Sequence, residues 1–422
     1  MKPLKICMVT TFYPPYNFGG DGVFIERLVT ALAKAGHEIH VIHDRDAYAF
    51  CAGDADRAAK PIEHSKPGNV TVHTLGNERH NILDLIAAHQ LGKPVGKSAQ
   101  LKELLSQGFD VVHFHNVSLM GGPEILKYGS GVKLCTLHDH WFVCATHVLW
   151  RFDQEACTKR TCLSCTLAAK KPPQLWRYTG AIADAARHID AFIAPSHFAK
   201  KSHLANGFPA DIKVLPHFIP DENRELSLSP TDDHQSSLDD LHPRPYFLFV
   251  GRLEKIKGVQ FLIEQFRNYR HADLVIAGSG NYEHELHLMA EGLNHIRFLG
   301  RVGPDRLKNF YRNAIATVVP SLCYETFGLV PLEGFAAGTP AIVHNLGALP
   351  EVVQGGGGLT YNNAEEFIAA LESLRTDPHG RAQLSRAASN NLLSNYTEQR
   401  HLSIYYDMIA ELSRSSSVQE VR

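Results

Sequence analysis

The feature that most constrains the fold is a repeated alternation of short apolar runs with helical or irregular segments. Runs that are apolar at nearly every position are typical of strands buried on both faces of a parallel sheet. Two such series occur, separated by residues 221–244, a segment rich in Asp, Ser and Pro. The predicted strands are residues 5–10, 38–43, 70–75, 110–116, 133–138, 191–196 and 213–218 in the first series, and 246–250, 272–277, 296–299, 316–320, 341–344 and 358–361 in the second.

Two series of this kind predict an α/β protein with two doubly wound, Rossmann-like domains. Ligands of such sheets bind outside the carboxyl ends of the strands, so a functional site is expected in the loops that follow the strands. The predicted organisation is an N-terminal domain at residues 1–220 with an insertion at 140–175, a linker at 221–244, a C-terminal domain at 245–400, and a C-terminal helix with a polar tail at 401–422.

The composition excludes several classes of protein. The 42 basic and 44 acidic residues among 422 leave a formal net charge of -2, so the basic excess typical of nucleic-acid-binding proteins is absent. No apolar run approaches the roughly 18 residues that span a bilayer, and the chain begins without an apolar signal-peptide core. We therefore expect a cytoplasmic protein, with peripheral contact to the inner face of the cytoplasmic membrane as an open alternative.

A glycine-rich turn follows the first predicted strand. It includes Gly19 and Gly20 and leads into an amphipathic helix, an arrangement in which the backbone can approach a phosphate at a helix N-terminus. The spacing differs from the dinucleotide-binding fingerprint, so a Rossmann oxidoreductase is a poor match. The same glycines would be needed if they served only the tight geometry of the turn.

A second candidate site is the stretch at residues 324–338, which is typical of a loop that enters a helix at Gly328. The first amides of that helix, from Gly328 to Val330, lack a helical acceptor and lie at the positive end of the helix dipole, so they can bind an anion. Glu325 precedes these amides, and Glu333 follows them by about 7 Å of helix rise. This arrangement suits a sugar, a diphosphate and a ribose, although acidic residues near a helix start also stabilise the dipole without a ligand.

Ordered motifs in both halves of the chain resemble glycosyltransferase family 4, a family of GT-B architecture in which two Rossmann-like domains face each other across a cleft. The resemblance covers nearly the whole chain. Its strongest motif is the E-x7-E stretch from Glu325 to Glu333. The other matching motifs are Phe249-Val250-Gly251-Arg252-Leu253, Lys257-Gly258, residues 274–280, Gly300-Arg301-Val302, Gly19-Gly20, residues 36–42, residues 110–113 and Pro195-Ser196.

The resemblance implies a nucleotide-sugar donor, either a UDP- or a GDP-sugar. Arg252 and Lys257 would bind its diphosphate, because a guanidinium and an ammonium together neutralise the phosphate charge that grows as the leaving group departs. Leu329 and Val330 would donate backbone amides to the same diphosphate. The predicted donor-binding stretch also includes Phe327 and Gly328.

The resemblance also assigns the remaining donor contacts. Glu333 would accept hydrogen bonds from the ribose, and the backbone near Val302 would face the base. Gly20, together with Gly19, would close over the diphosphate from the N-terminal domain. Glu325 would hold hydroxyl groups of the donor sugar.

His138, at the end of a predicted strand, matches the family histidine that lies against the donor sugar near the reacting carbon. We therefore predict that His138 and Glu325 are the catalytic residues. The resemblance implies retention of anomeric configuration without a catalytic metal, by a same-face displacement in which the departing phosphate helps to deprotonate the acceptor. No protein nucleophile is assigned. Two residues depart from the family pattern, namely Asp21 in the glycine-rich turn and Thr326 after Glu325.

Four of the eight cysteines form a cluster directly after His138. Four thiolates suit tetrahedral zinc or an iron–sulfur cluster, so we predict a structural metal site that fixes the loop carrying His138. A similar insertion, with His-Asp-x-Trp leading to Cys, occurs in a subset of the family. Free buried thiols are the alternative. The predicted ligands are Cys144, Cys157, Cys162 and Cys165.

The segment at residues 170–178 mixes basic and aromatic side chains. Such a patch can lie on an anionic membrane surface, where a lipid-linked acceptor would be found. A solvated turn with one packed tryptophan would have the same composition. Both interpretations stay open.

These observations predict a retaining glycosyltransferase that moves a sugar from a nucleotide-sugar to a glycan or lipid-linked acceptor in bacterial surface polysaccharide synthesis. The acceptor is implied by the resemblance rather than by particular residues. Two alternatives stay open. One is a nucleotide-sugar 2-epimerase of the same architecture, and the other is a regulatory protein whose thiol cluster senses metal or redox state.

Overall fold

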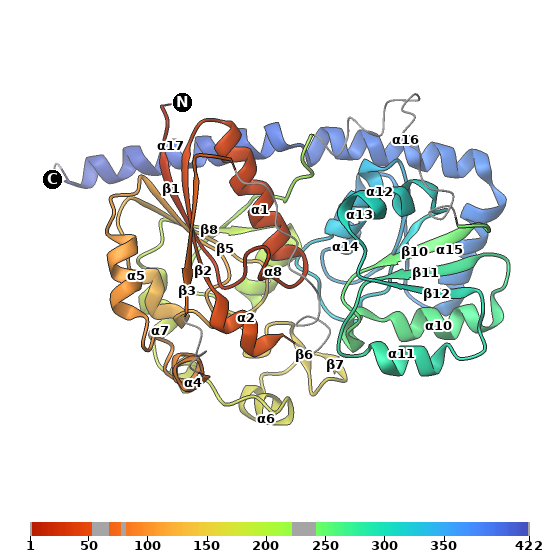
Figure 1. Ribbon diagram of the computed structural model, residues 1–422, viewed down its shortest axis with the longest axis horizontal. Helices are drawn as coiled ribbons and strands as arrows, with labels where there is room; N and C mark the ends of the chain where they lie inside the picture. The colour runs from red at the N-terminus through yellow and green to blue at the C-terminus, as the bar shows by residue number, and fades with distance from the viewer. Residues whose placement is uncertain (1, 53–66, 77–81, 222–241, 421–422) are drawn as a thin grey trace. The chain divides into compact units, whose positions relative to one another are not determined.

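The computed structural model describes residues 2–52, 67–76, 82–221 and 242–420, with side chains as far as residue 415. Most of the predicted linker at 221–244 lies outside the described residues. The chain divides into two compact units: Met1–Pro216 with Gln399–Arg422 form the first, and His217–Glu398 form the second. Each unit is an α/β domain on a parallel sheet, which confirms the predicted fold class (Figure 1).

The first unit contains a seven-stranded parallel sheet with the order β3-β2-β1-β4-β5-β8-β9. Its central strands are buried at almost every position, because helices cover both faces of the sheet. Consecutive strands run outward in opposite directions from β1 and β4, so a topological switch point lies at the carboxyl ends of these two strands. The strands are β1 Lys5–Val9, β2 Glu38–Asp44, β3 Val70–Leu75, β4 Val111–Phe114, β5 Val132–Thr136, β8 Ala191–Ala194 and β9 Ile212–Val214.

Several helices of the first unit pack on this sheet through apolar side chains. Helix α1 buries Phe24, Ile25 and Leu28, and the Ser196 hydroxyl caps α8 by accepting the Ala199 amide over 2.9 Å. The helices are α1 Gly19–Lys34, α2 Arg45–Cys51, α4 Ile82–Leu91, α5 Ser98–Leu105, α6 Cys162–Ala168, α7 Ala181–Ala186, α8 His197–Ala205 and α17 Glu398–Glu420, with 3-10 helices η1 Gly122–Lys127 and η2 Leu175–Tyr178.

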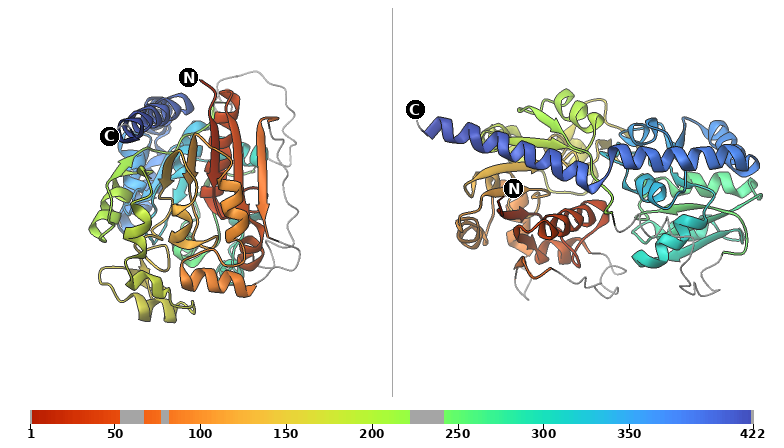
Figure 2. Two further views of the ribbon diagram at one scale, coloured as in Figure 1. Left: turned by 90° about the vertical axis from the view of Figure 1, so that its left-hand side faces the viewer. Right: turned by 90° about the horizontal axis from the view of Figure 1, so that it is seen from above.

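The C-terminal helix α17 belongs almost entirely to the first unit (Figure 2). Its Tyr405 hydroxyl lies 3.0 Å from Nδ1 of His113 in β4, and its His401 Nδ1 donates to the Pro216 carbonyl over 2.7 Å. The helix continues to Glu420. An anchored helix gains one hydrogen bond for each residue added, which makes extension far easier than nucleation.

The second unit contains a six-stranded parallel sheet with the order β12-β11-β10-β13-β14-β15. Its switch point lies between β10 and β13. The strands are β10 Tyr246–Val250, β11 Asp273–Ala277, β12 Ile296–Gly300, β13 Thr317–Val319, β14 Ala341–His344 and β15 Gly358–Tyr361, and the helices are η4 Lys255–Lys257, α10 Val259–Asn268, α11 Glu283–Met289, α12 Pro304–Asn313, α13 Leu329–Ala336, α14 Leu349–Gln354, α15 Ala364–Thr376 and α16 Pro378–Asn395.

The insertion after β5 carries elements that apolar periodicity does not predict. Strands β6 Trp150–Arg151 and β7 Glu155–Ala156 pair antiparallel as a separate two-stranded hairpin, and α6 follows them. Two-residue strands are too short to show a period of two. Within the described ranges, no helix has both the length and the apolar character that crossing a bilayer requires.

Candidate functional site

In the second unit, the predicted donor-binding residues gather at the carboxyl ends of β10 and β13. These strands are neighbours in the sheet although they are far apart in sequence. Arg252 follows β10, Lys257 lies in η4, and Glu325 lies in the loop after β13. The switch point therefore brings the predicted basic and acidic residues to one edge of the sheet.

Lys257 and Glu325 form an ion pair. The Lys257 Nζ lies 2.7 Å from Oε1 of Glu325, and the Ser321 hydroxyl donates to the same oxygen over 2.6 Å. Burial alone would lower the pKa of Lys257, but the charge of Glu325 raises it above its ordinary value. Lys257 is therefore an ammonium throughout the physiological pH range, and it orients a carboxylate that stands 68 residues away in sequence.

Two glycines let the backbone pack closely around this ion pair. Gly258 has a φ of 78°, and a Cβ there would lie 2.1 Å from the Pro320 carbonyl oxygen. Gly347 has a φ of 66°, and a Cβ there would lie 2.8 Å from the backbone nitrogen and oxygen of Glu325. Gly258 belongs to a sequence motif, whereas the only signal for Gly347 is a glycine soon after a strand.

Helix α13 begins at Leu329, one residue later than predicted, with Gly328 at its N-cap. Gly328 has no side chain to bond the first amides, so those of Leu329 and Val330 lie at the positive end of the helix dipole without a capping side chain. The Phe327 ring is buried in the apolar core, 6.0 Å from the ring of Tyr396. The Phe327 side chain is therefore part of the core of the second unit.

The second carboxylate of the E-x7-E motif has a fixed partner. The Tyr311 hydroxyl of α12 donates to Oε2 of Glu333 over 2.9 Å, and Tyr311 is 3% exposed. A single tyrosine in an amphipathic helix carries no functional signal in sequence, so this partner was not predicted. Val302, just before α12, is half-buried against the apolar cluster that contains Tyr246 and Phe310.

Arg252 pairs with Glu254, whose Oε1 accepts from its Nε over 2.6 Å. The two side chains are 28% and 27% exposed. An ion pair of this exposure contributes at most about 1 kcal/mol. A phosphate that binds Arg252 can therefore displace Glu254 at small cost.

In the first unit, His138 lies two residues after β5 and contacts a second histidine. Its Nε2 is 2.9 Å from Nδ1 of His115, and Nε2 of His115 is 3.4 Å from the Met8 sulfur. A thioether has no proton, so His115 donates to Met8 through Nε2, and in the tautomer with one proton it accepts at Nδ1. His138 then donates through its own Nε2. These contacts hold the His138 ring in one tautomer and one orientation.

Burial keeps His138 and His113 neutral. It lowers the pKa of His138 to about 4, and it lowers the pKa of His113 well below its ordinary value. The ring centroids of His113 and His115 lie 4.0 Å apart. At neutral pH, His138 is therefore an uncharged hydrogen-bonding group and supplies no positive charge to a phosphate.

The predicted glycine pair lies inside a helix. Helix α1 begins at Gly19, so Gly19 and Gly20 form its first turn and offer amides of the kind that bind anions. Asp21 shares this turn and accepts the Gly22 amide over 2.9 Å. Burial, with a smaller contribution from the charge of Asp139, raises the pKa of Asp21 to about 6.

The raised pKa of Asp21 makes the stability of the chain depend on pH. The folded chain keeps this proton up to about pH 6, whereas an Asp in the unfolded chain loses it near 3.8. Between these values the folded state binds more protons, so the free energy of unfolding falls as the pH rises, by up to about 3 kcal/mol above pH 6. Asp21→Asn is therefore expected to raise the melting temperature near pH 7.5 more than near pH 4.5, as measured by scanning calorimetry.

The matched control for this variant is Glu264→Gln, because Glu264 is an exposed acid on α10. The control is expected to leave the melting temperature unchanged at both pH values. An equal shift by Asp21→Asn at the two pH values would contradict the pKa assigned to Asp21.

Asp139 organises the loop directly after His138. Its Oδ1 accepts the Trp141 amide over 2.8 Å, and its Oδ2 lies 2.9 Å from Nδ1 of His147. Burial alone would raise the pKa of Asp139, but the charge and hydrogen bond of His147 lower it below its ordinary value. Asp139, which directly follows His138, is therefore ionised and holds the first part of the insertion through Trp141 and His147.

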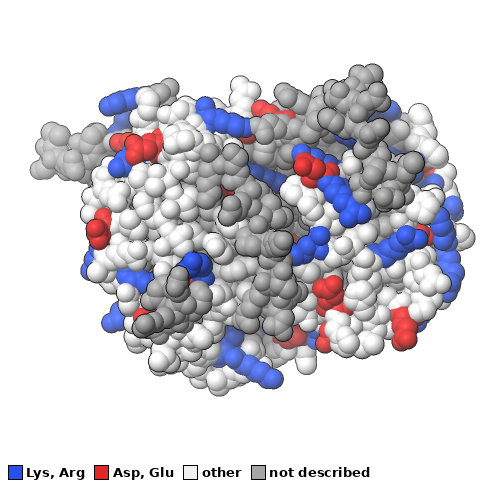
Figure 3. Space-filling model, in the orientation of Figure 1, with Lys and Arg blue, Asp and Glu red and all other residues white. Residues whose placement is uncertain are grey.

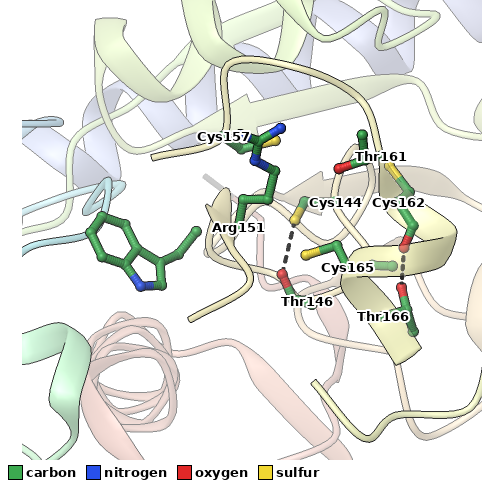
Figure 4. A pocket seen from close by; sticks show the side chains of 10 residues that line it. Cys144, Thr146, Arg151, Cys157, Thr161, Cys162, Cys165 and Thr166 are labelled. Carbon is green, nitrogen blue, oxygen red and sulfur yellow. Dashed lines mark hydrogen bonds between the residues drawn. The ribbon is translucent and has the colours of Figure 1, made fainter. Parts of the chain in front are cut away.

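The four clustered cysteines line one pocket in the insertion, between the β6–β7 hairpin and α6 (Figure 4). All four are free thiols. In the part of the chain that the structure describes, no group of three or more His, Cys, Asp or Glu side chains is arranged to hold a metal ion. The structure therefore does not support the predicted zinc or iron–sulfur site at Cys144, Cys157, Cys162 and Cys165.

The surroundings of the thiols explain this difference. The Cys144 sulfur lies 3.3 Å from the Thr146 hydroxyl, and the Cys157 thiol donates to the Lys159 carbonyl over 3.5 Å. Burial, and then the neighbouring thiols, raise the pKa values of Cys157 and Cys162. A metal ion displaces thiol protons when it binds, so the directions of these side chains, rather than their protonation, bear on metal binding. Spacing brings the cysteines together but does not orient them.

Known proteins are similar to this chain over almost its full length. The family model described as Glycosyltransferase Family 4 matches residues 18–223, and the model described as Glycosyl transferases group 1 matches residues 231–391. An uncharacterized glycosyltransferase of Methanocaldococcus jannaschii is 28% identical over 375 residues, which cover 83% of each chain. The glycogen synthase of Mycobacterium tuberculosis is 28% identical over 422 residues, covering 94% of this chain and 92% of that protein.

Solved structures show the same fold. The Anabaena protein HepE, in complex with UDP and glucose, superposes with a TM-score of 0.69 at 16% identity, covering 97% of this chain and 100% of that chain. The two family models, the relatives and the shared fold confirm the resemblance that the sequence motifs carry. The chain is a glycosyltransferase of family 4 with the GT-B fold.

Proposed function

We propose that this glycosyltransferase transfers a sugar from a nucleotide-sugar donor with retention of anomeric configuration. The observation that carries the proposal is the ion pair between Lys257 and Glu325 at the switch point of the second unit, a few residues before the N-terminus of α13. This edge of the sheet therefore combines the Lys257 cation, the Glu325 carboxylate and the anion-binding amides of α13. A diphosphate joined to a sugar requires these three chemical groups.

The proposed diphosphate site consists of Lys257, Arg252 and the first amides of α13. Negative charge grows on the phosphate as the bond to the sugar breaks, and two fixed cations stabilise that charge more than they stabilise the bound donor. The pair of Arg252 with Glu254 is partly exposed, so a phosphate can displace Glu254 from it at small cost. The amides of Leu329 and Val330 add dipoles of the right sign.

The nucleoside is proposed to bind beside α12 and α13. Glu333 accepts hydrogen bonds from the ribose, and the Tyr311 hydroxyl keeps its carboxylate oriented. The backbone at Val302 faces the base. A UDP-sugar is the first donor to test, since the HepE structure of the same fold holds UDP and glucose.

Glu325 and His138 are proposed to act on the donor sugar. Lys257 and Ser321 both donate to Oε1 of Glu325, so this side chain is held in place before the sugar arrives. Neutral His138 offers a hydrogen-bonding ring in a fixed tautomer. The departing phosphate takes the proton of the acceptor hydroxyl, and no residue of the chain forms a covalent intermediate.

The proposed acceptor is a glycan or lipid-linked saccharide in bacterial surface polysaccharide synthesis, handled at the inner face of the cytoplasmic membrane. This part of the proposal rests on the family rather than on a contact in the site. An acceptor assay with lipid-linked and free saccharides separates the two classes.

A thermal-shift screen against UDP-, GDP- and ADP-sugars tests the donor site. A ligand at a hundred times its dissociation constant stabilises the folded state by about 2.7 kcal/mol, which corresponds to a rise of roughly 5 °C. We expect one nucleotide to produce this shift, and Glu333→Gln to reduce it while Glu264→Gln on α10 leaves it intact. If no nucleotide-sugar shifts the transition, or if the donor is isomerised without any acceptor, the proposed function is wrong.

A further inference from the structure

The insertion carries a surface that combines exposed apolar and basic side chains. We use the name insertion surface for the exposed side chains between Lys159 and Tyr178. Its apolar members are Leu163, Leu167, Leu175 and Tyr178, which are 49%, 57%, 64% and 64% exposed. Its basic members are Lys159, Arg160, Lys170 and Lys171, all of which are exposed.

The two leucines of α6 point outward because the opposite face of the helix is already occupied. Cys162 and Cys165 line the pocket under α6, and Thr166 is buried with its hydroxyl donating to the Cys162 carbonyl over 2.6 Å. Leu163 and Leu167 are four residues apart and share the other face. Rotation of α6 to bury them would expose the pocket-lining side.

The two apolar side chains of η2 are fixed in the same way. The Trp176 indole nitrogen donates to the His89 carbonyl of α4 over 2.9 Å, and Nε2 of Gln174 lies 2.7 Å from Nε2 of His89. Trp176 and Gln174 are buried. Leu175, which lies between them in sequence, and Tyr178, the last residue of η2, therefore face outward. The exposed positions therefore belong to an anchored segment.

The charge of this segment has one sign. From Cys157 to Ala183 the sequence contains no Asp or Glu, while the four basic side chains of the insertion surface are exposed. Basic side chains lie over α6 on the face shown in Figure 3. In a chain whose total charge is close to zero, this segment is a local concentration of positive charge.

We propose that the insertion surface docks on an anionic phospholipid bilayer, with the leucines and Tyr178 in the interfacial layer and the basic side chains on the lipid phosphates. Apolar side chains flanked by Lys and Arg, with no acidic residue among them, suit this partner. A second copy of the chain is a poorer fit, because a two-fold contact would oppose like charges. The inference rests on the proposed function, since docking would bring the enzyme to a lipid-linked acceptor.

Vesicle flotation with the full chain tests the proposal. The probes are phosphatidylcholine vesicles with and without phosphatidylglycerol, at low and high salt. The wild-type chain is expected to float only with the anionic vesicles at low salt. Each basic residue near such a surface contributes a factor of about 5 to the binding constant, so Lys170→Gln with Lys171→Gln should weaken binding about 25-fold. Leu163→Ser with Leu167→Ser should weaken it at least about tenfold.

The matched control is Lys201→Gln with Leu204→Ser on α8, where both side chains are also exposed. This variant should bind as the wild type does. Unchanged binding by the two insertion-surface variants, or no wild-type binding at low salt, would overturn the proposal. So would self-association in sedimentation that the leucine variant abolishes, because the surface would then join two copies.

The same variants separate this proposal from the proposed function. Their thermal shifts with a nucleotide-sugar are expected to equal that of the wild type, because the substituted side chains are exposed and the diphosphate and nucleoside contacts are assigned to the second unit. Loss of vesicle binding with an intact donor shift supports both proposals. Vesicle binding without any thermal shift by a nucleotide-sugar would support membrane docking and contradict the proposed donor binding.

Discussion

The Glu325→Gln variant is expected to lose about 100- to 1000-fold in kcat. The substitution removes the carboxylate proposed to hold the donor sugar and the charge that raises the pKa of Lys257. It also leaves a partly buried ammonium without its carboxylate partner, so the cation is less firmly positioned for the phosphate. The nucleotide keeps its contacts to α13, so KM for the donor should change less than about tenfold.

Initial rates with saturating acceptor over a donor series measure this effect. The control is Glu264→Gln, which removes one exposed carboxylate of the second unit and should retain wild-type kcat. Lys257→Met is expected to lower kcat and raise KM together, because it removes charge felt by both the bound donor and the departing phosphate. A Glu325→Gln variant with unchanged kcat would show that this carboxylate does not act in turnover.

Substitutions along the histidine pair of the first unit are expected to have the second largest effect. His138→Phe should lower kcat by at least about 100-fold, and His115→Phe by about tenfold, because His115 only orients His138. His115→Asn should retain most activity, since its amide oxygen can accept the His138 proton where Nδ1 accepts it now. The rates follow from stopped assays at saturating donor.

The pH dependence of the rate tests whether His138 acts in turnover, because a purely structural role for His138 would not alter it. With a pKa of about 4, His138 stays neutral, so its ionisation should not appear in the wild-type rate between about pH 6 and 8. The control His188→Phe replaces an exposed histidine and should leave rate and profile unchanged. If His115→Asn were as impaired as His115→Phe, the orienting hydrogen bond would not be the cause.

The sheets could be predicted from the sequence because buried parallel strands have a strong local signal. Strands β10, β14 and β15 have the predicted bounds, since each is a short, mostly apolar run that begins after a proline or a glycine. The predicted end of the last strand of the first series, at residue 218, lies four residues beyond the end of β9 at Val214. Apolar side chains continue after that strand because residues 217–219 pack elsewhere, with Phe218 and Ile219 buried outside the sheet.

In the candidate site, the motif residues could be predicted from the sequence and their hydrogen-bond partners could not. Glu325, Glu333 and Lys257 belong to short motifs, so sequence alone selected them. Their partners Ser321 and Tyr311 have no motif of their own, and only the fold brings them to 2.6 and 2.9 Å from the carboxylates. A hydrogen bond between distant segments forms only when the chain packs, so it cannot be predicted from local sequence.

The cysteine cluster shows that the spacing of residues in sequence does not predict the directions of their side chains. The sequence predicted that four sulfurs meet in one region, and they line one pocket. Whether sulfurs converge on one point depends on side-chain directions set by the hairpin, α6 and local partners such as Thr146. These directions are decided by packing, and here they do not make a metal site within the described residues.

By itself, the sequence determined the architecture and selected the candidate site residues, because both depend on short-range patterns: apolar runs that must be buried and motifs with fixed spacing. The tertiary structure decided which groups are charged and which are fixed. Lys257 is a permanent cation because Glu325 lies beside it, and His138 is neutral in one tautomer because burial and His115 make it so. Charge state and orientation depend on neighbours in space, and those neighbours come from strands and loops far apart in the chain.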